Sequence, residues 1–316
     1  MLYGFGVDLG GTTVKLAYFD AAGTLLDKWE IPTDTKGEGS RILPDIAASV
    51  RAYLDTNRIP DGHIMGIGIG VPGPVNRKGV VDRCVNLGWG RFNVEQTLSN
   101  LTGFPVRAGN DANLAALGEC WKGSGQGCDN MVMVTLGTGI GGGIIMDGHV
   151  IFGARGAAGE IGHIVLNRDE PELHTSGQRG CAEQYCSATG VVRLATRYLN
   201  STSAPSILRQ CDPITCKDVF DAGNAGDPAA LAILEQFYGL LGEFLANLCD
   251  VLDPEAVVLG GGVSKAGPIL LEGIRPHFFK HVFHAVRDVR FKIASLGNDA
   301  GVYGAFKLAL QSFGQS

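Results

Sequence analysis

Several features that mark other classes of protein are missing from this sequence of 316 residues. No run of Lys and Arg is present, and the formal net charge is −6. A nucleic-acid-binding protein usually carries a basic patch, so we expect no nucleic-acid partner. The eight cysteines include no CxxC pair. Without a leader they are expected to be reduced thiols, mostly buried.

Signals for export and for membrane insertion are also missing. The N-terminus has no basic segment followed by an apolar core, as a secretory signal would. The longest uncharged stretch, Met131 to Met146, is rich in glycine and shorter than the roughly 20 residues of a membrane span. We therefore expect a cytoplasmic protein with no membrane partner.

Two common nucleotide-binding motifs are missing as well. The sequence contains no GxxxxGK[ST], so it has no Walker P-loop. Gly68 and Gly137 each begin a GxGxxG pattern, and Glu160 lies 23 residues after Gly137. A dinucleotide site requires a helix to start at the third glycine, but Pro74 follows one pattern and a second strand follows the other. These contexts argue against a dehydrogenase.

What the sequence does contain is a glycine-rich hairpin that occurs twice. Residues 132–145 read VMVTLGTGIGGGII, with five glycines from Gly137 to Gly143. Residues 5–20 read FGVDLGGTTVKLAYFD, again with an apolar strand on each side of the glycines. Backbone N–H groups that no side chain covers can hold phosphate oxygens. Two such hairpins predict two clamps on one polyphosphate.

The order of the other elements predicts an α/β fold with two similar lobes. Strands come first as a meander, and they then alternate with helices, twice over. Ser40 is expected to cap one helix and Asn93 another. The pair Asp227-Pro228 predicts the start of a long helix that Asp253-Pro254 ends. Expected strands are 3–9, 14–20, 25–31, 63–71, 104–108 and 256–259, the last followed by three glycines and a new helix. Other expected helices include 112–121 and the C-terminal segment from Gly297.

Polar residues beside the first hairpin provide candidates for phosphate and Mg²⁺ binding. Asp8 ends the first strand, and one carboxylate can hold Mg²⁺ that keeps several waters. The hydroxyls of Thr12, Thr13 and Thr138 could donate hydrogen bonds to phosphate. Each also has a simpler interpretation: Asp8 as a turn residue, the threonines as ordinary strand formers, and Lys15 as a solvated charge.

A second set of polar residues could hold and activate a polyhydroxylated ligand. Asn110 and Asp111 lie where a strand meets a helix N-terminus, although one of them could be only an N-cap. Glu160 and His163 follow a stretch of small residues, and Glu183 comes later. Carboxylates, an amide and an imidazole together match sugar hydroxyls, which both donate and accept hydrogen bonds. A kinase acting on an alcohol needs such groups beside its phosphate clamps.

These motifs resemble the ROK family of repressors, open reading frames and sugar kinases over nearly the whole chain. They occur in the family's order: DLGGTTVKL, GVPGPV, NLGW, GNDAN, LGTGIGGG, GEIGH, GCAE, LGGGVS and LGNDAG. The sequence most resembles the glucokinases of that family. The resemblance implies an actin-like, hexokinase-like ATPase fold with duplicated ribonuclease-H-like lobes. The lobes are expected at 1–109, completed by a helix at about 298–316, and at 110–297.

The resemblance also implies roles for individual residues. Asp111 would be the general base that takes the proton of the 6-hydroxyl of a hexose, glucose first among them. The sugar would be bound by Asn110, Asp111, Glu160, His163, Glu183 and Gly73. ATP would be bound by Asp8, through Mg²⁺ and water, and by Gly10, Gly11, Thr12, Thr13, Lys15, Gly137, Thr138, Gly139, Gly261 and Gly262, the last two near the adenine. A homodimer is expected from the family alone.

One departure from the family concerns zinc. Many members bind zinc through the His of GEIGH and three cysteines of CxCGxxGCxE. This chain keeps His163 and Cys181 but has His174 and Ser176 at two of the cysteine positions. Serine is a poor zinc ligand, and Cys186 lies at a different offset. We expect that zinc is not bound and that His163 is available to the sugar; the alternative is a site completed by Cys186.

Two alternatives to a glucose kinase remain. One is a kinase for fructose, mannose, allose or an N-acetylated amino sugar, since all of these share the motifs. The other is a sugar-sensing regulator without catalysis. Asp111 argues against a regulator. So does the expected first strand near Leu2, which leaves no room for the DNA-binding segment of family repressors.

Overall fold

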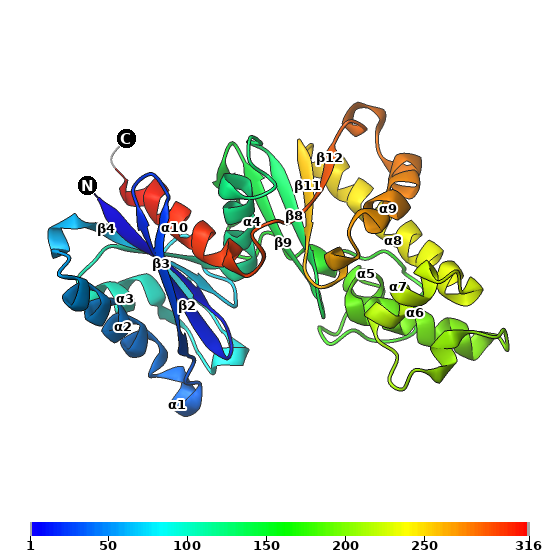
Figure 1. Cartoon of the computed structure of the whole chain (residues 1–316), viewed down its shortest axis with the longest axis horizontal. Helices are drawn as coiled ribbons and strands as arrows, with labels where there is room; N and C mark the ends of the chain where they lie inside the picture. The colour runs from blue at the N-terminus through cyan, green and yellow to red at the C-terminus, as the bar shows by residue number, and fades with distance from the viewer. Residues whose placement is uncertain (1, 315–316) are drawn as a thin grey trace. The chain divides into compact units, whose positions relative to one another are not determined.

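The computed structural model describes residues 2–314 and divides into two compact units, shown in Figure 1. Unit 1 consists of Met1–Asp129, Gly143–Gly159 and Ser295–Ser316. Unit 2 consists of Asn130–Gly142 and Glu160–Ala294. Each unit thus contains segments that lie far apart in the sequence. The lobe boundary expected at residue 109 stays a prediction.

The sheet of unit 1 has the strand order β3-β2-β1-β4-β7. Its first three strands form an antiparallel meander, and β4 and β7 run parallel to β1 and β4 respectively. This confirms the N-terminal hairpin expected from the sequence. The strands are β1 (Tyr3–Leu9), β2 (Thr13–Asp20), β3 (Leu25–Pro32), β4 (Ile64–Val71) and β7 (Val106–Asn110).

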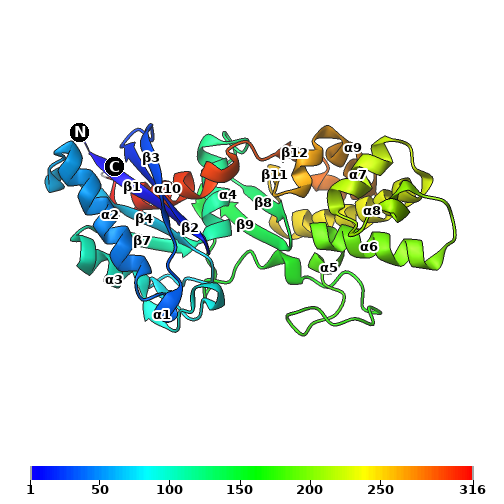
Figure 2. The same ribbon diagram turned by 60° about the horizontal axis from the view of Figure 1, so that its bottom comes forward.

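Helices cover both faces of this sheet (Figure 2). On one face, α2 (Ile42–Asn57) packs its apolar stripe against β1 and β4, and α3 (Val94–Thr102) lies beside it. On the other face, α10 (Ala300–Phe313) packs directly on the strands. Glycine makes this close approach possible: a Cβ at Gly68 would lie 1.7 Å from Ala305 O.

The short 3₁₀ and extended segments of unit 1 complete its connections. A small two-stranded sheet pairs β5 (Val80–Val81) with β6 (Phe92–Asn93). Asn93 caps α3, as expected, because its side chain accepts the N–H of Gln96. The cap expected at Ser40 is wrong. Ser40 has helical dihedral angles, α2 begins after Arg41, and no side chain caps it.

The second sheet has the order β10-β9-β8-β11-β12. Strands β8, β11 and β12 are parallel neighbours, and β9 pairs with β10 in the antiparallel sense. The central glycine-rich stretch forms the end of β8, a turn and the start of β9, as expected. The strands are β8 (Met131–Leu136), β9 (Ile140–Met146), β10 (His149–Val150), β11 (Ala256–Gly260) and β12 (Arg290–Ile293).

Unit 2 is built around α8 (Pro228–Leu252), which begins and ends where the sequence predicts. Asp227 caps it by accepting the N–H of Ala230, and Asp253 ends it with φ 42°. By length and composition alone α8 could cross a membrane, with a mean hydropathy of 1.3. However, 61% of that window is buried inside the protein, as in a core helix. Its neighbours are α5 (Glu183–Cys186), α6 (Ala188–Ser201), α7 (Cys216–Asn224) and α9 (Pro268–His281).

The observed fold is α/β, as expected. Six of the eight cysteines are buried, which agrees with the expectation of mostly buried thiols. One local expectation needs refinement. The segment after β11 first forms a 3₁₀ turn, Val263–Ala266, and the following α-helix begins only at Pro268.

Candidate active site

The N-terminal hairpin of unit 1 is open as a phosphate cradle requires. Its turn is closed by the Gly10 N–H, which donates to Thr13 O at 3.0 Å. The N–H groups of Gly11 and Thr12 have no protein partner within residues 2–314, and both residues are exposed. A Cβ at Gly11 would meet nothing within 4 Å. Successive free N–H groups in a turn can bind an anion.

Asp8 and Lys15 face each other across this hairpin. The Lys15 Nζ lies 3.6 Å from Asp8 Oδ2 and donates to Asn298 O at 3.1 Å, so Lys15 is not simply a solvated charge. Burial raises the pKa of Asp8, and Lys15 opposes this rise. At Gly301, a Cβ would lie 2.6 Å from Asp8 Cγ. The glycine of LGNDAG therefore lets the first turn of α10 approach the carboxylate.

Asp8 fits a single-carboxylate Mg²⁺ site. Mg²⁺ commonly takes one or two protein carboxylates, with phosphate oxygens and water completing its shell. Within residues 2–314 no three His, Cys, Asp or Glu side chains gather as a metal cluster. A magnesium ion at this site would take its other ligands from water and from a bound phosphate.

Asn110 combines two roles at the junction of β7 with α4 (Asp111–Lys122). It is the N-cap of α4, because Oδ1 accepts the N–H of Asn113 at 3.1 Å. Its Nδ2 donates to Asp111 Oδ1 at 3.0 Å and to Gly73 O at 3.4 Å. The simple N-cap interpretation is thus right but incomplete, since the same amide connects Asp111 and Gly73.

Asp111 is a partly buried carboxylate, and hydrogen bonds hold one of its oxygens. Its Oδ1 accepts the N–H of Ala112 at 2.8 Å as well as the Asn110 amide. Its Oδ2 has no hydrogen-bond partner in the described part of the chain. Burial raises the pKa of Asp111 to about 6, the N–H of Ala112 opposes the rise, and Asp8 adds to it. A base works best when its pKa is near the operating pH.

In the glycine hairpin of unit 2, some backbone N–H groups already have partners within the protein. Gly137 N donates to Gly139 O, and Gly137 O accepts the N–H of Ala188 at 2.8 Å. Ile140 N donates to Glu183 Oε2 at 2.6 Å. The N–H groups of Thr138 and Gly139 have no protein partner among the described residues. A Cβ at Gly139 would lie 2.3 Å from Glu183 Oε2, so this carboxylate needs the glycine.

Glu183 is held from a second side by His174, which the sequence analysis assigned only to a possible zinc site. His174 Nε2 lies 2.6 Å from Glu183 Oε1, and His174 Nδ1 lies 2.8 Å from Ser176 Oγ. The His174 side chain is 11% exposed and that of Glu183 is 24% exposed, so their contact is largely shielded from water, whereas Ser176 is exposed. We call this chain of hydrogen bonds the Ser176–His174–Glu183 relay.

Glu160 and His163 lie beside the relay with more exposed side chains. His163 Nε2 is 3.8 Å from Glu160 Oε2. The side chains are 39% exposed in His163 and 55% in Glu160, which leaves both open to a ligand. The rings of His163 and His174 meet edge to face at 5.7 Å.

The residues at the positions of the family's zinc site do not fit a zinc ion. Neither of the two ring nitrogens of His174 is free, and the Cys181 thiol faces Gln184 Oε1 at 3.7 Å. Burial raises the pKa of Cys181, which opposes the thiolate form that zinc requires. Burial also raises the pKa of Cys186, whose side chain is fully buried.

Gly261 and Gly262 follow β11 in unit 2, next to the end of β8. Gly261 has φ 83°, and a Cβ there would lie 2.5 Å from Leu136 O. Only glycine fits this position. Gly262 has open space around it. These two glycines therefore give a bare backbone surface near the second hairpin.

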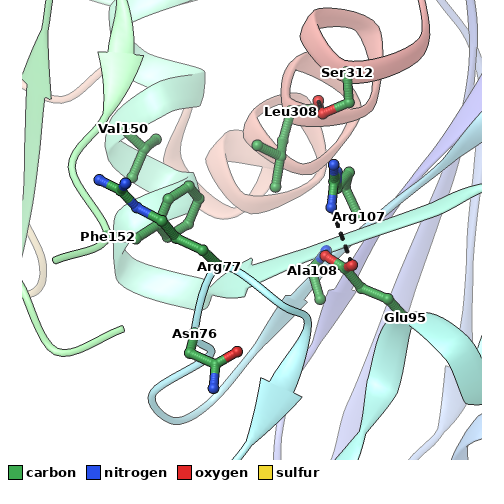
Figure 3. A pocket seen from close by; sticks show the side chains of 9 residues that line it. All are labelled: Asn76, Arg77, Glu95, Arg107, Ala108, Val150, Phe152, Leu308 and Ser312. Atoms are coloured by element: carbon green, nitrogen blue, oxygen red, sulfur yellow. Dashed lines mark hydrogen bonds and ion pairs between the residues drawn. The ribbon is translucent and has the colours of Figure 1, made fainter. Parts of the chain in front are cut away.

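Candidate site residues line a cavity in unit 2 but not a cavity in unit 1. In unit 2 a cavity of about 410 Å³ is lined by Thr138, Gly139, His174 and Glu183, among others. In unit 1 a cavity of about 260 Å³, shown in Figure 3, has none of the expected site residues in its lining. Arg107 there is paired with Glu95 at 3.2 Å.

Sequence reasoning missed three features of the site. The approach of Gly301 to Asp8 joins residues distant in sequence, and the His174–Glu183 contact depends on how the loop between them folds back, so a motif reveals neither. The third is Asn113, which is 1% exposed and has no side-chain hydrogen bond within residues 2–314. Its place in GNDAN was the only available signal.

Two five-stranded sheets, each carrying a glycine hairpin with some free backbone N–H groups, match the hexokinase-like ATPase fold. The ROK family model matches residues 4–312, so the chain belongs to the ROK family.

Individual relatives agree with this assignment. A glucokinase from Halalkalibacterium halodurans is 43% identical, covering 97% of this chain and 94% of that protein. The crystal structure of a ROK family glucokinase from Streptomyces griseus in complex with glucose and AMPPNP has a TM-score of 0.73 and 35% identity, covering 98% and 99% of the two chains. An N-acetylgalactosamine kinase from Shewanella is 33% identical over 95% of this chain and 94% of that protein.

Proposed function

We propose that this protein is an ATP-dependent hexose kinase, a transferase that converts glucose and ATP to glucose 6-phosphate and ADP. The observation that carries the proposal is Asp111, a partly buried carboxylate with a raised pKa and one oxygen that has no partner within residues 2–314. The similarity to glucokinases, one of them solved with glucose and AMPPNP, supports both substrates.

In the proposed reaction Asp111 accepts the proton of the sugar 6-hydroxyl, and the oxygen of that hydroxyl attacks the γ-phosphorus of ATP. The bond from that phosphorus to the bridging oxygen breaks, and ADP leaves with the bonding electrons. The amide of Asn110 and the N–H of Ala112 hold Oδ1, which directs Oδ2 toward the hydroxyl. Phosphoryl transfer of this kind depends mainly on positioning and on charge stabilisation.

The remaining sugar contacts are proposed from the residues around these groups. Asn110 and the backbone at Gly73 would bind hydroxyls beside the base. In unit 2, Glu160 and His163 have exposed side chains, and Glu183 is held at the edge of the cavity. Carboxylates and imidazole can each accept or donate toward hydroxyls, according to protonation.

The phosphates of ATP would bind to the open N–H groups of both glycine hairpins. The free N–H groups are those of Gly11 and Thr12 in unit 1 and of Thr138 and Gly139 in unit 2. Gly10, Thr13, Lys15 and Gly137 would contribute to the phosphate site beside them. Asp8 would hold Mg²⁺ through water, and the ion would neutralise charge on the β- and γ-phosphates. The adenine would lie near Gly261 and Gly262.

A second candidate is a kinase for an N-acetylated amino sugar. The N-acetylgalactosamine kinase from Shewanella, at 33% identity, favours it. The glucokinase from Halalkalibacterium halodurans, at 43%, favours glucose.

A coupled assay of ADP release decides between the two candidates. The purified protein is given ATP, Mg²⁺ and one sugar at a time: glucose, mannose, fructose, allose, N-acetylglucosamine or N-acetylgalactosamine. The proposal requires the highest kcat/KM with glucose. A preference for an N-acetylated sugar would favour the second candidate, and no ADP release with any sugar would contradict both.

We further propose that the protein is a cytoplasmic homodimer whose product enters glycolysis. We also propose two lobes, one at 1–109 completed by 298–316 and one at 110–297. The dimer, the glycolytic role and the lobes rest on the family resemblance. Light scattering during size-exclusion chromatography tests the dimer directly: a mass near 33.2 kDa would mean a monomer.

A further inference from the structure

Bonds within the chain itself hold the loop that carries His174. Its two strands meet at the bridges Val165–Cys181 and Leu173–Arg179. The turn between them is closed by His174 itself, whose N–H donates to Gln178 O at 2.7 Å and whose carbonyl accepts the N–H of Gly177 at 2.9 Å. The backbone of residues 165–181 thus fixes the position of the His174 backbone, from which the ring extends.

Side chains from α5 and α6 anchor the same loop. Glu170, with a fully buried side chain, accepts two hydrogen bonds from Arg197, at 2.7 and 2.9 Å, and one from Tyr185. These bonds from Arg197 hold the pKa of Glu170 well below its usual range. Gln184 accepts the N–H of Gly180 at 2.7 Å and donates to Glu172 O at 3.2 Å. Paired charges and hydrogen bonds therefore supply the cross-links that a metal would otherwise supply.

Glu183 needs this support, because its carboxylate is fixed by only two groups. Ile140 N holds Oε2 and His174 Nε2 holds Oε1. Without His174 the Oε1 atom would have no other hydrogen-bond partner within residues 2–314, and the carboxylate could rotate about its last bond. Hydrogen bonds to ionised groups are among the stronger ones in proteins and fix geometry.

We infer that His174 is a positioning residue for sugar binding, and that the Ser176–His174–Glu183 relay replaces a zinc ion in this chain. Ser176 fixes the orientation of the imidazole, and the imidazole fixes the carboxylate of Glu183. The inference rests on the proposed function, in which Glu183 binds a sugar hydroxyl.

Substitution of His174 by Ala and by Gln separates positioning from bulk packing. The Gln side-chain amide can still donate to Glu183 Oε1, whereas Ala cannot. We expect His174→Ala to raise the dissociation constant for glucose about ten-fold or more, as loss of a hydrogen bond to a charged group does. His174→Gln should restore binding to within about three-fold of wild type on the same scale. The KM for ATP should change little in both.

Gln178→Ala is the matched control, because Gln178 is exposed in the same loop and its only contact in the relay region is through its backbone carbonyl. It should bind glucose like wild type. Ser176→Ala serves as a second variant, since Ser176 is exposed and its loss should not unfold the loop. It should weaken glucose binding in the same direction as His174→Ala, by a smaller factor.

Two measurements test the inference. Calorimetric titration gives the glucose affinity of each variant, and the zinc content is measured in the chelator-washed wild type. Weak binding in His174→Ala, rescue in His174→Gln and no stoichiometric zinc support the inference. Equal binding in the Ala, Gln and wild-type proteins, or one zinc per chain that resists washing, overturns it while glucose phosphorylation by the wild type still stands. A wild type that neither binds nor phosphorylates any sugar overturns the proposed function and the inference together.

Discussion

At the scale of single residues, neighbouring groups hold each carboxylate of the proposed site. The Asn110 amide bonds to Asp111, and His174 bonds to Glu183. Asn110 and Asp111 were recognisable because a polar pair follows an apolar strand and precedes a helix. The contact between His174 and Glu183 was not, since it depends on how the loop 165–181 folds back. Motif spacing suggested a metal for His174, and tertiary structure gives it a carboxylate instead.

Asp111→Asn should abolish turnover and leave sugar binding nearly intact. The amide has a similar size and can still bond to Asn110, but it cannot accept a proton. Loss of a general base typically lowers kcat by ~10²–10⁴-fold. Steady-state kcat and the glucose dissociation constant measure the two effects separately. Asp55→Asn, at an exposed position of α2, is the control and should behave as wild type. A variant with more than about a tenth of wild-type kcat would rule out Asp111 as the base.

The pH dependence of catalysis should report the raised pKa of Asp111. Burial is its main cause and places it at about 6. The base acts only when deprotonated, so activity is present above this pKa and is lost as the pH falls through it. Below it, kcat/KM for glucose should decrease about ten-fold per pH unit. Initial rates at saturating ATP, from roughly pH 5 to pH 8, test this. A profile that stays flat across the acidic range would show that no such base limits the reaction.

At the scale of elements, caps and periodicity predicted most helices and strands, because these signals are local. Asn93 and Asp227 cap the helices expected of them. Ser40 does not, because Gly37 and Glu38 before it turn the chain with positive φ and leave Ser40 in helical geometry. The contact of α4 with α10 could not be predicted, since it joins segments nearly 200 residues apart and leaves no local pattern.

Gly304→Ala should destabilise the protein and lower its activity. A Cβ at Gly304 would lie 1.6 Å from Leu114 O, so α4 and α10 would have to separate. Overpacking of this kind costs about 1–3 kcal/mol or more. Because Asp111 begins α4, movement of the helix also displaces the proposed base.

Thermal unfolding of Gly304→Ala beside Gly62→Ala tests this prediction. A Cβ at Gly62 would meet nothing within 4 Å, and the residue does not have a positive φ. Gly62→Ala should therefore unfold close to the wild-type temperature. Equal melting temperatures for the two variants would mean that the helices adjust without cost.

At the scale of the whole molecule, the sequence predicted an α/β protein with repeated sheet architecture, and the structure has two five-stranded sheets. The repeated glycine hairpin was the signal. What the sequence could not predict is that 143–159 belongs with the N-terminal segment, although it follows the second hairpin in the chain. Contacts between distant segments decide this, and hydrophobic periodicity does not identify the partner of an apolar face.

Ligands that bind only the folded protein should raise its melting temperature in two steps. Glucose at about 100 times its dissociation constant should add ~2.7 kcal/mol to the free energy of unfolding. A non-hydrolysable ATP analogue with Mg²⁺ should add a further increment, since its proposed contacts at Gly11 and Thr138 do not involve the sugar groups. Differential scanning fluorimetry measures both shifts. L-glucose is the control, because it has the same composition but the mirror-image arrangement of hydroxyls. A shift with L-glucose as large as that with D-glucose would show that stabilisation comes from non-specific solvation and not from a sugar site.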